Sequence, residues 1–296
     1  MIRGTARDHA LYAAMTSIWG ASFFFTALAL RSFNPYMVVL VRMAVAAAVL
    51  GVVVRARGLS VPRERRTLGH LLVLGAGNMA LPFTLLTLAQ EHVTSSTAVV
   101  LSATTPVFVF LIASLGLRAE RFTVGRLAGI GTAFAGMVLL AGGGVELWGW
   151  PLAVVASSAL FASGNVYTRR RLPHLDPAVI AFGQIAAAVL CLLPVTALTG
   201  HLEVGEVRPV PALALLELGL LASAAAYLLY FRFILRWGST AASVNTYLQP
   251  FVGLLLGGLV LDEAMSGRQW AALGVILAGL LVFGAARLSP GRARRG

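Results

Sequence analysis

The amino-acid sequence predicts an all-α integral membrane protein with ten transmembrane helices, arranged as two inverted five-helix repeats with both termini in the cytoplasm. Composition is the first of three observations behind this prediction, because 58% of the 296 residues are hydrophobic and only 11% are charged. A soluble domain usually has about a quarter charged residues. Much of the surface of any soluble fold faces water, so a chain of this length could not bury so much apolar surface. The other two observations are the number of long apolar segments and the one-sided distribution of arginine.

Ten apolar segments can be placed along the chain, each close to the length that a membrane-spanning helix needs, which is about 20 residues. Helix-stop and turn signals separate several of them, including Asn34-Pro35, the glycines at 142–144, and Asp176-Pro177. The connections are too short to form a soluble domain. No small-residue cleavage site follows the first segment, so it is expected to be a retained helix. The segments are 10–30, 35–54, 68–89, 94–117, 123–141, 147–168, 177–199, 210–231, 239–261 and 267–286.

The arginines test this count, because the cytoplasmic connections of membrane proteins carry an excess of basic residues. All 23 basic residues are arginine, and the net charge is +12. With a cytoplasmic N-terminus, Arg31, Arg208 and Arg268 lie in outer connections, Arg42 lies inside a span, and the remaining nineteen lie on the cytoplasmic side. One missed or extra helix would destroy this alternation. The arginines form short groups and no long basic face, so nucleic acid is not an expected partner.

The second half of the chain resembles the first, most clearly where residues 93–142 match residues 238–286. We therefore expect repeats over 1–142 and 143–296, each with five spans. An odd number of spans reverses direction, which gives the inverted design that secondary transporters often use, with a substrate site near the midplane. A duplication kept only for stability is the alternative. The aligned residues are Pro106 with Pro250, Glu120 with Glu263, Gly131 with Gly274, Gly136 with Gly279, Asn34-Pro35 with Asp176-Pro177, and Trp19 with Phe161.

Taken in order, these features resemble the EamA-type branch of the drug/metabolite transporter superfamily. The markers are the Trp19-Gly20 pair in the first helix, Arg42 in the second, the helices that contain Pro106 and Pro250, the glutamate that follows each of these helices, and the glycine-rich fifth and tenth helices. The resemblance covers the whole chain. It implies a carrier in a bacterial inner membrane that exports or exchanges amino acids, nucleotide precursors, other metabolites or drugs. Amino acids with large or aromatic side chains are the expected solutes, and a multidrug or other metabolite exporter is the alternative.

Polar and aromatic side chains inside the spans are the candidate substrate-binding residues, because a polar group in hydrocarbon is costly unless it faces protein or a watery cavity. Each has a competing structural explanation, since serine and threonine often bond to their own helix and aromatic rings can simply pack. Pro106 and Pro250 are expected to kink their helices and free backbone carbonyls. Asn245 and Gln249, four residues apart, are expected on one helical face. The candidates are Trp19, Ser22, Asn78, Phe83, Thr104, Phe161, Asn165, Tyr227, Asn245 and Gln249, with Thr26, Pro82, Ser102 and Thr105 beside them.

Arg42 and Glu217 are charged residues inside predicted spans. Arg42 could bind a substrate carboxylate, but it could equally reach the interface or cap carbonyls of neighbouring helices, and the structural role is the favoured interpretation. Glu217 is expected to pair with a basic or hydroxyl group, with proton coupling as the alternative. Proton-driven and sodium-driven carriers commonly hold acidic residues deep in the membrane. Their scarcity here favours a facilitated carrier.

Other functional classes have less support. The five histidines lie at helix ends or in loops, and the sequence has no HExxH, no GxSxG and no pair of deep carboxylates, so neither an enzyme nor a metal site is predicted. No cofactor is expected, and the single Cys191 excludes an internal disulfide. A channel or receptor would also be polytopic, but an inverted repeat with kinked central helices favours alternating access. The expected partners are a small-molecule solute and membrane lipids. A monomer is expected, with the Gly125–Gly129 and Gly253–Gly257 spacings serving internal helix contacts.

Overall fold

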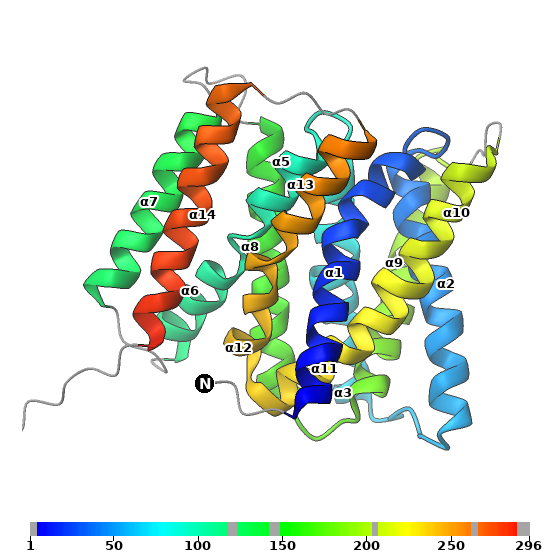
Figure 1. Ribbon diagram of the computed structural model, residues 1–296. Helices are drawn as coiled ribbons and strands as arrows, with labels where there is room; N and C mark the ends of the chain where they lie inside the picture. Colours follow the sequence, from blue (N-terminus) through cyan, green and yellow to red (C-terminus); the bar gives the residue numbers. More distant parts are fainter. Residues whose placement is uncertain (1–4, 118–122, 142–148, 203–206, 262–265, 289–296) are drawn as a thin grey trace, which may run out of the picture.

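The computed structural model describes residues 5–117, 123–141, 149–202, 207–261 and 266–288, and every regular element within these ranges is helical (Figure 1). The all-α class is therefore confirmed. The boundary between the predicted repeats, and the aligned Glu120 and Glu263, lie outside the described residues. The elements are α1 (Ala6–Ala29), α2 (Pro35–Ala56), α3 (Arg65–Leu74), η1 (Gly75–Ala80), α4 (Leu81–Ala89), α5 (Ser95–Ser102), α6 (Thr105–Leu117), α7 (Val124–Ala141), α8 (Gly149–Arg171), α9 (Pro177–Leu198), α10 (Pro209–Glu217), η3 (Leu218–Ala225), α11 (Ala226–Trp237), α12 (Ser239–Ser243), η4 (Val244–Tyr247), α13 (Gln249–Val260) and α14 (Gly267–Leu288).

Six helical segments of the described chain are long and apolar enough to cross a membrane. Trp270–Ala285, within α14, is a shorter apolar helix. The membrane class of the protein agrees with these segments, whereas the count of ten spans stays a prediction. The six segments are Ala6–Ala29, Pro35–Ala56, Arg65–Ala89, Ser95–Ile112, Pro177–Leu198 and Pro209–Trp237.

Two of the turn signals in the sequence begin helices as expected. Asn34 is the N-cap of α2, where its side-chain oxygen accepts a hydrogen bond from the backbone N–H of Met37 at 2.9 Å. Asp176 is the N-cap of α9 and accepts from the N–H of Ala178 at 2.8 Å. The proline that follows each cap occupies the first helical turn, where its missing N–H costs nothing. These local signals fix where α2 and α9 start.

Two of the long apolar segments contain a wide π-helical turn. η1 joins α3 to α4, and η3 joins α10 to α11, so each segment stays helical throughout. Glycine lies at a close contact in both turns. A Cβ atom added at Gly75 would lie 2.5 Å from the Cβ of Ala187 in α9, and one added at Gly219 would lie 2.6 Å from a methyl group of Val45 in α2. The π turns therefore bring η1 against α9 and η3 against α2 at closer range than any larger residue allows.

The two proline-containing helices differ from the kinked helices that the sequence predicts, because each is fully interrupted. The chain leaves α5 after Ser102 and starts α6 at Thr105, so that Pro106 occupies the first turn of a new helix. In the second half, η4 is a 3-10 turn that separates α12 from α13, and Pro250 lies in the first turn of α13. Proline is tolerated in a first turn because no hydrogen bond is lost there. The expected kinks are helix breaks.

α7 and α14, the last helices of the two predicted repeats, pack side by side at one edge of the bundle (Figure 1). Gly136 and Gly279, aligned in the sequence, both lie in this contact. A Cβ atom at Gly136 would be 2.7 Å from the backbone nitrogen of Ile276, and one at Gly279 would overlap the backbone of Ala133. The two helices therefore touch backbone to backbone.

The small-residue spacings also serve contacts within the chain. A Cβ atom at Gly129 would lie 2.5 Å from the backbone nitrogen of Phe283 in α14, and one at Gly253 would lie 2.7 Å from a methyl group of Val99 in α5. The expectation of internal helix packing is confirmed at these two glycines.

Adding one methyl group in the α7–α14 contact tests its tightness. Gly279→Ala is expected to destabilise the protein by about 1–3 kcal/mol, because overpacking forces the two backbones apart. Gly274→Ala is a matched control on the same helix, since a Cβ there meets nothing within 4 Å. Thermal unfolding in detergent, followed by size-exclusion chromatography, should show a lower midpoint for Gly279→Ala than for the control. Equal midpoints would contradict the close contact.

Candidate substrate-binding site

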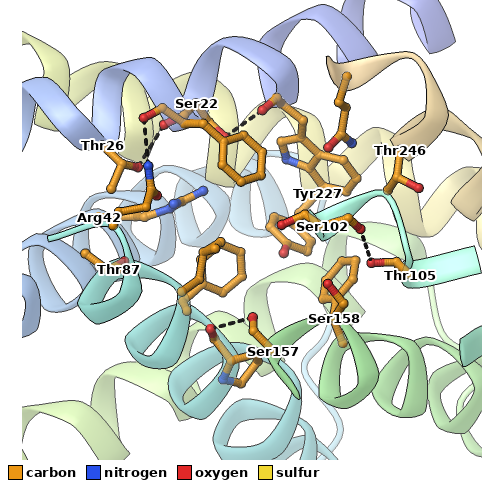
Figure 2. Close-up of a pocket in the computed structure, with 18 residues that line it drawn as sticks. Ser22, Thr26, Arg42, Thr87, Ser102, Thr105, Ser157, Ser158, Tyr227 and Thr246 are labelled. Atoms are coloured by element: carbon orange, nitrogen blue, oxygen red, sulfur yellow. Dashed lines mark hydrogen bonds between the residues drawn. The ribbon is translucent and has the colours of Figure 1, made fainter. Parts of the chain in front are cut away.

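A cavity lies between the two halves of the chain, where α1, α2, α4 and the α5–α6 break face α8, α11 and the η4–α13 break (Figure 2). Its empty space is about 670 Å³, including space at its open side. Pockets for small organic molecules typically measure about 300–1,000 Å³. The lining residues are Trp19, Ser22, Phe23, Thr26, Arg42, Pro82, Phe83, Leu86, Thr87, Gln90, Ser102, Thr105, Ser157, Ser158, Phe161, Tyr227, Thr246 and Gln249.

An aromatic wall, defined as Trp19, Phe83, Phe161 and Tyr227, forms part of this lining. The ring centroids of Trp19 and Tyr227 are 5.1 Å apart, those of Trp19 and Phe161 are 6.2 Å apart, and those of Phe83 and Tyr227 are also 6.2 Å apart. All three pairs are edge to face, the arrangement that aromatic quadrupoles prefer. The indole N–H of Trp19 donates to the carbonyl of Ala222 at 2.8 Å, so this donor is satisfied within the protein. The four rings therefore give the cavity a mainly apolar wall.

Hydroxyl groups form a second part of the lining. Most of them donate their proton to a carbonyl three or four residues earlier in the chain, as Thr26 does to Ser22 at 2.8 Å and Thr105 does to Ser102 at 2.8 Å. Ser157 instead donates to the carbonyl of Pro82 at 2.7 Å and so joins the two halves. A hydroxyl that has donated its proton keeps lone pairs on its oxygen. These side chains therefore offer the cavity acceptors more than donors.

Arg42 supplies the only formal charge among the lining residues of this cavity. Its side chain is 3% exposed, its Nε donates to the hydroxyl of Ser223 at 2.7 Å, and its guanidinium carbon lies 4.4 Å above the ring of Phe83. Stacking on an aromatic face is favourable for a guanidinium group. The arginine is thus held at a fixed place beside the cavity by one hydrogen bond and one ring.

Of the residues that the sequence singled out, the structure brings Trp19, Ser22, Phe83, Phe161, Tyr227, Gln249 and Arg42 together at the cavity, along with Thr26, Pro82, Ser102 and Thr105. Four candidates lie outside its lining, and three of these form hydrogen bonds elsewhere. Asn78 donates to Gln184 at 2.9 Å, Asn165 donates to the hydroxyl of Tyr230 at 2.9 Å, and Thr104 donates to the carbonyl of Leu101 at 2.7 Å. Asn78 and Asn165 thus join neighbouring helices, whereas Thr104 satisfies a backbone carbonyl at the α5–α6 break.

Asn245 and Gln249 do not share a face, although their spacing of four would place them so on a continuous helix. The 3-10 turn η4 and the start of α13 lie between them and rotate the chain differently. Gln249 lines the cavity, whereas Asn245 is fully buried, with no hydrogen-bond partner for either side-chain atom among the described residues. Glu217 also lies outside the lining, and its Oε2 is buried without a partner in the described part of the chain.

Sequence reasoning missed five polar lining residues. Thr87 and Gln90 follow Phe83 at helical spacings of four and seven, and Ser157 and Ser158 precede Phe161 by four and three. Thr246 lies in η4. Extending the helical face from each aromatic candidate would have found the first four. Nothing in the local sequence indicates the 3-10 geometry that turns Thr246 toward the cavity.

A bundle of apolar helices around a solute-sized cavity built from both halves is the architecture of a membrane transport protein. The profile of the EamA-like transporter family matches residues 9–142 and again residues 148–285. The chain therefore belongs to the EamA-like transporter family, as the sequence markers indicate.

Three relatives are 28% identical to this chain. An uncharacterized transporter of Archaeoglobus fulgidus aligns over 87% of this chain and 90% of its own length. The uncharacterized inner membrane transporter YedA of Escherichia coli K12 aligns over 89% and 86%. A probable terminal-alkyne amino-acid exporter of Streptantibioticus cattleyicolor aligns over 93% and 94%. A solved crystal structure with 20% identity has a TM-score of 0.73 and covers 97% of this chain and 100% of that one, which shows a shared fold.

Cysteine labelling can separate a lining residue from a buried neighbour. Ser102 lines the cavity, whereas Thr104, two residues along, is 5% exposed and lies outside the lining. In a Cys191→Ala background, Ser102→Cys is expected to react with a small water-soluble methanethiosulfonate several times faster than Thr104→Cys, because thiol reactivity follows access. Mass spectrometry of quenched time points gives both rates. Faster labelling of Thr104→Cys would place the cavity elsewhere.

Proposed function

We propose that the protein is a secondary transporter that exports or exchanges small organic metabolites, above all amino acids with large or aromatic side chains, across a bacterial inner membrane. The cavity between the halves carries this proposal, because one wall suits an apolar side chain while hydroxyl oxygens and a buried arginine suit polar ends. Two relatives support the location and the solute class, since one is named an inner membrane transporter and another a probable amino-acid exporter.

We also propose ten spans in two inverted repeats, 1–142 and 143–296. Equivalent irregularities in the two halves support this arrangement. The π turns η1 and η3 begin at Gly75 and Leu218, and the prolines that open α6 and α13 are Pro106 and Pro250, so the offset is close to 144 in both cases. The family profile also matches once in each half. Inverted repeats of this kind can exchange conformations and so open a central site to either side in turn.

In the proposed topology the cavity belongs to the outer half of the protein. Two of its lining residues, Thr26 and Gln90, lie at the ends of α1 and α4 that are remote from the arginine-rich connections. At the cytoplasmic ends of α1 and α11 the two halves are in contact. The rings of Tyr12 in α1 and Phe233 in α11 pack edge to face with centroids 5.4 Å apart, and Nη1 of Arg236 lies 2.9 Å from each carboxylate oxygen of Asp8. This arrangement corresponds to an outward-facing state.

Counterflow in proteoliposomes tests the transport proposal. Vesicles loaded with unlabelled L-phenylalanine should accumulate external labelled L-phenylalanine transiently above its equilibrium level, because a carrier exchanges solute without any other energy source. Labelled L-tryptophan and L-leucine extend the panel. A protonophore should leave the overshoot unchanged, since the cavity lining contains no acidic residue. Protein-free vesicles are the control.

Other results would contradict this proposal. Ion conductance at channel rates would favour a channel. Transport that depends strictly on a proton gradient would rule out a facilitated carrier. The absence of counterflow with every amino acid of the panel would reject amino acids as the solutes.

Weakening the cytoplasmic closure should shift the protein towards its inward-facing state. Arg236→Gln removes the two-oxygen contact with Asp8, whereas Arg232→Gln removes only the longer 3.3 Å contact and serves as the matched control. In Ser102→Cys protein in intact cells, Arg236→Gln is expected to slow labelling by a membrane-impermeant thiol reagent more than Arg232→Gln does. Unchanged labelling would show that this ion pair does not hold the inner side closed.

A further inference from the structure

We propose that Arg42 is the anchor for a carboxylate of the transported solute, so that the cavity selects organic acids and zwitterions over cations. This inference rests on the proposed function, because it assumes that the cavity between the halves is the transport site. It differs from the interpretation that the sequence favoured, in which Arg42 has a structural role only.

The first argument is that most hydrogen-bond donors of Arg42 are unused. A guanidinium group has five N–H donors in a planar fork. Nε donates to Ser223 at 2.7 Å, while Nη1 and Nη2 make no hydrogen bond or ion pair with any described residue. A charged group that is almost fully buried is costly without a partner. Four N–H groups of Arg42 are therefore available to an acceptor in the cavity.

The second argument is the charge balance of the cavity. Among its lining residues there is no aspartate, glutamate, lysine or histidine, so Arg42 gives the site a net positive charge. Glu217 lies outside the lining and forms no ion pair with Arg42 in the described structure, although the two charges are close enough to interact electrostatically. A cationic drug or polyamine would meet a positive charge that no lining residue compensates, whereas a carboxylate would neutralise it. This balance argues against a general exporter of cations.

The third argument is the geometry around the guanidinium group. Phe83 lies 4.4 Å beneath it and Ser223 holds its Nε, so the outer edge of the fork has a fixed direction. In the view of Figure 2, Arg42 lies at one side of the lining residues, between Thr26 and Thr87. A planar fork fixed in this way suits a carboxylate, which accepts two parallel N–H···O bonds.

The rest of the lining matches the other two parts of an amino acid, its side chain and its ammonium group. With the carboxylate at Arg42, an apolar side chain can reach the aromatic wall, and an ammonium group can donate to hydroxyl oxygens such as that of Ser22, which has given its own proton to the carbonyl of Trp19 at 2.7 Å. Because Arg42 is the only charged lining residue, the carboxylate is the part of such a solute that finds a charged partner here. Acids without an ammonium group should therefore bind as well.

A matched set of probes tests this inference directly. L-Phenylalanine, 3-phenylpropionate, L-phenylalaninamide and phenethylamine share one aromatic ring and differ in which charged group they carry. Binding is measured as ligand-induced thermal stabilisation of the purified protein in detergent, where membrane permeation of the probes does not matter. The two carboxylates should stabilise the wild-type protein, and the amide and the amine should bind about tenfold more weakly or not at all, the loss expected for a missing charged hydrogen bond.

Arg42→Gln should abolish this preference, and Arg42→Lys, which keeps the charge but not the fork, should keep part of it. Arg126→Gln is the matched control. Arg126 is also buried and also lies 4.4 Å from a phenylalanine ring, that of Phe110, but it is in α7 and outside the cavity lining. If Arg42→Gln fails to fold, the comparison of Arg42→Lys with the wild type decides the question.

The outcomes separate this inference from the proposed function. Carboxylate preference in the wild type and in Arg126→Gln, lost in Arg42→Gln, supports the anchor. Equal binding of acid and amide, or a preference that survives Arg42→Gln, overturns the anchor while amino-acid counterflow can still succeed. Failure of both binding and counterflow for every probe overturns the proposed function and the anchor together.

Discussion

Inside a membrane every backbone N–H and C=O group must find its partner within the protein, and the rest of this structure depends on that constraint. At both helix breaks, side chains supply hydrogen bonds to backbone carbonyls that the interrupted helix leaves without their usual partners. At the α5–α6 break the buried Thr104 donates to the carbonyl of Leu101 at 2.7 Å, and at η4 the buried Thr246 donates to the carbonyl of Ser243 at 2.9 Å. Both breaks border the cavity. Irregular backbone is therefore confined to places where protein or solute-accessible space surrounds it.

The same constraint explains why the helices approach so closely. In lipid, the hydrophobic effect does not drive two helices together, so their association must come from close packing. Gly136 and Gly279 let the backbones of α7 and α14 meet, and Gly75 and Gly219 do the same for the π turns. Many of these contacts join residues of opposite halves. The two halves that build the cavity walls are thus in close contact at small residues.

The sequence predicts local features of this fold well because their causes are local. A cap such as Asn34 needs only its own side chain and the next turn. The membrane class and the family follow from composition and from the order of markers, which no tertiary contact can alter. The faces of interrupted helices are different, because their rotation depends on the geometry of the break. Asn245 illustrates this, since one 3-10 turn removes it from the face of Gln249. Asn78 lies in a π turn and donates a hydrogen bond to Gln184, a partner 106 residues away that no local pattern indicates.

Arg42 connects the chemistry of the proposed site to the movement of the proposed carrier. While the cavity is open to water, solvent can reach the unused donors of the guanidinium group through the site that it lines. Closing an empty cavity would remove that water and leave a buried charge without a partner, at an effective cost of several kcal/mol. A bound carboxylate supplies two acceptors before the water leaves, so the loaded carrier closes at lower cost than the empty one. A carrier with this property returns across the membrane more readily with solute than without it, and exchange of one organic acid for another is then faster than net leakage.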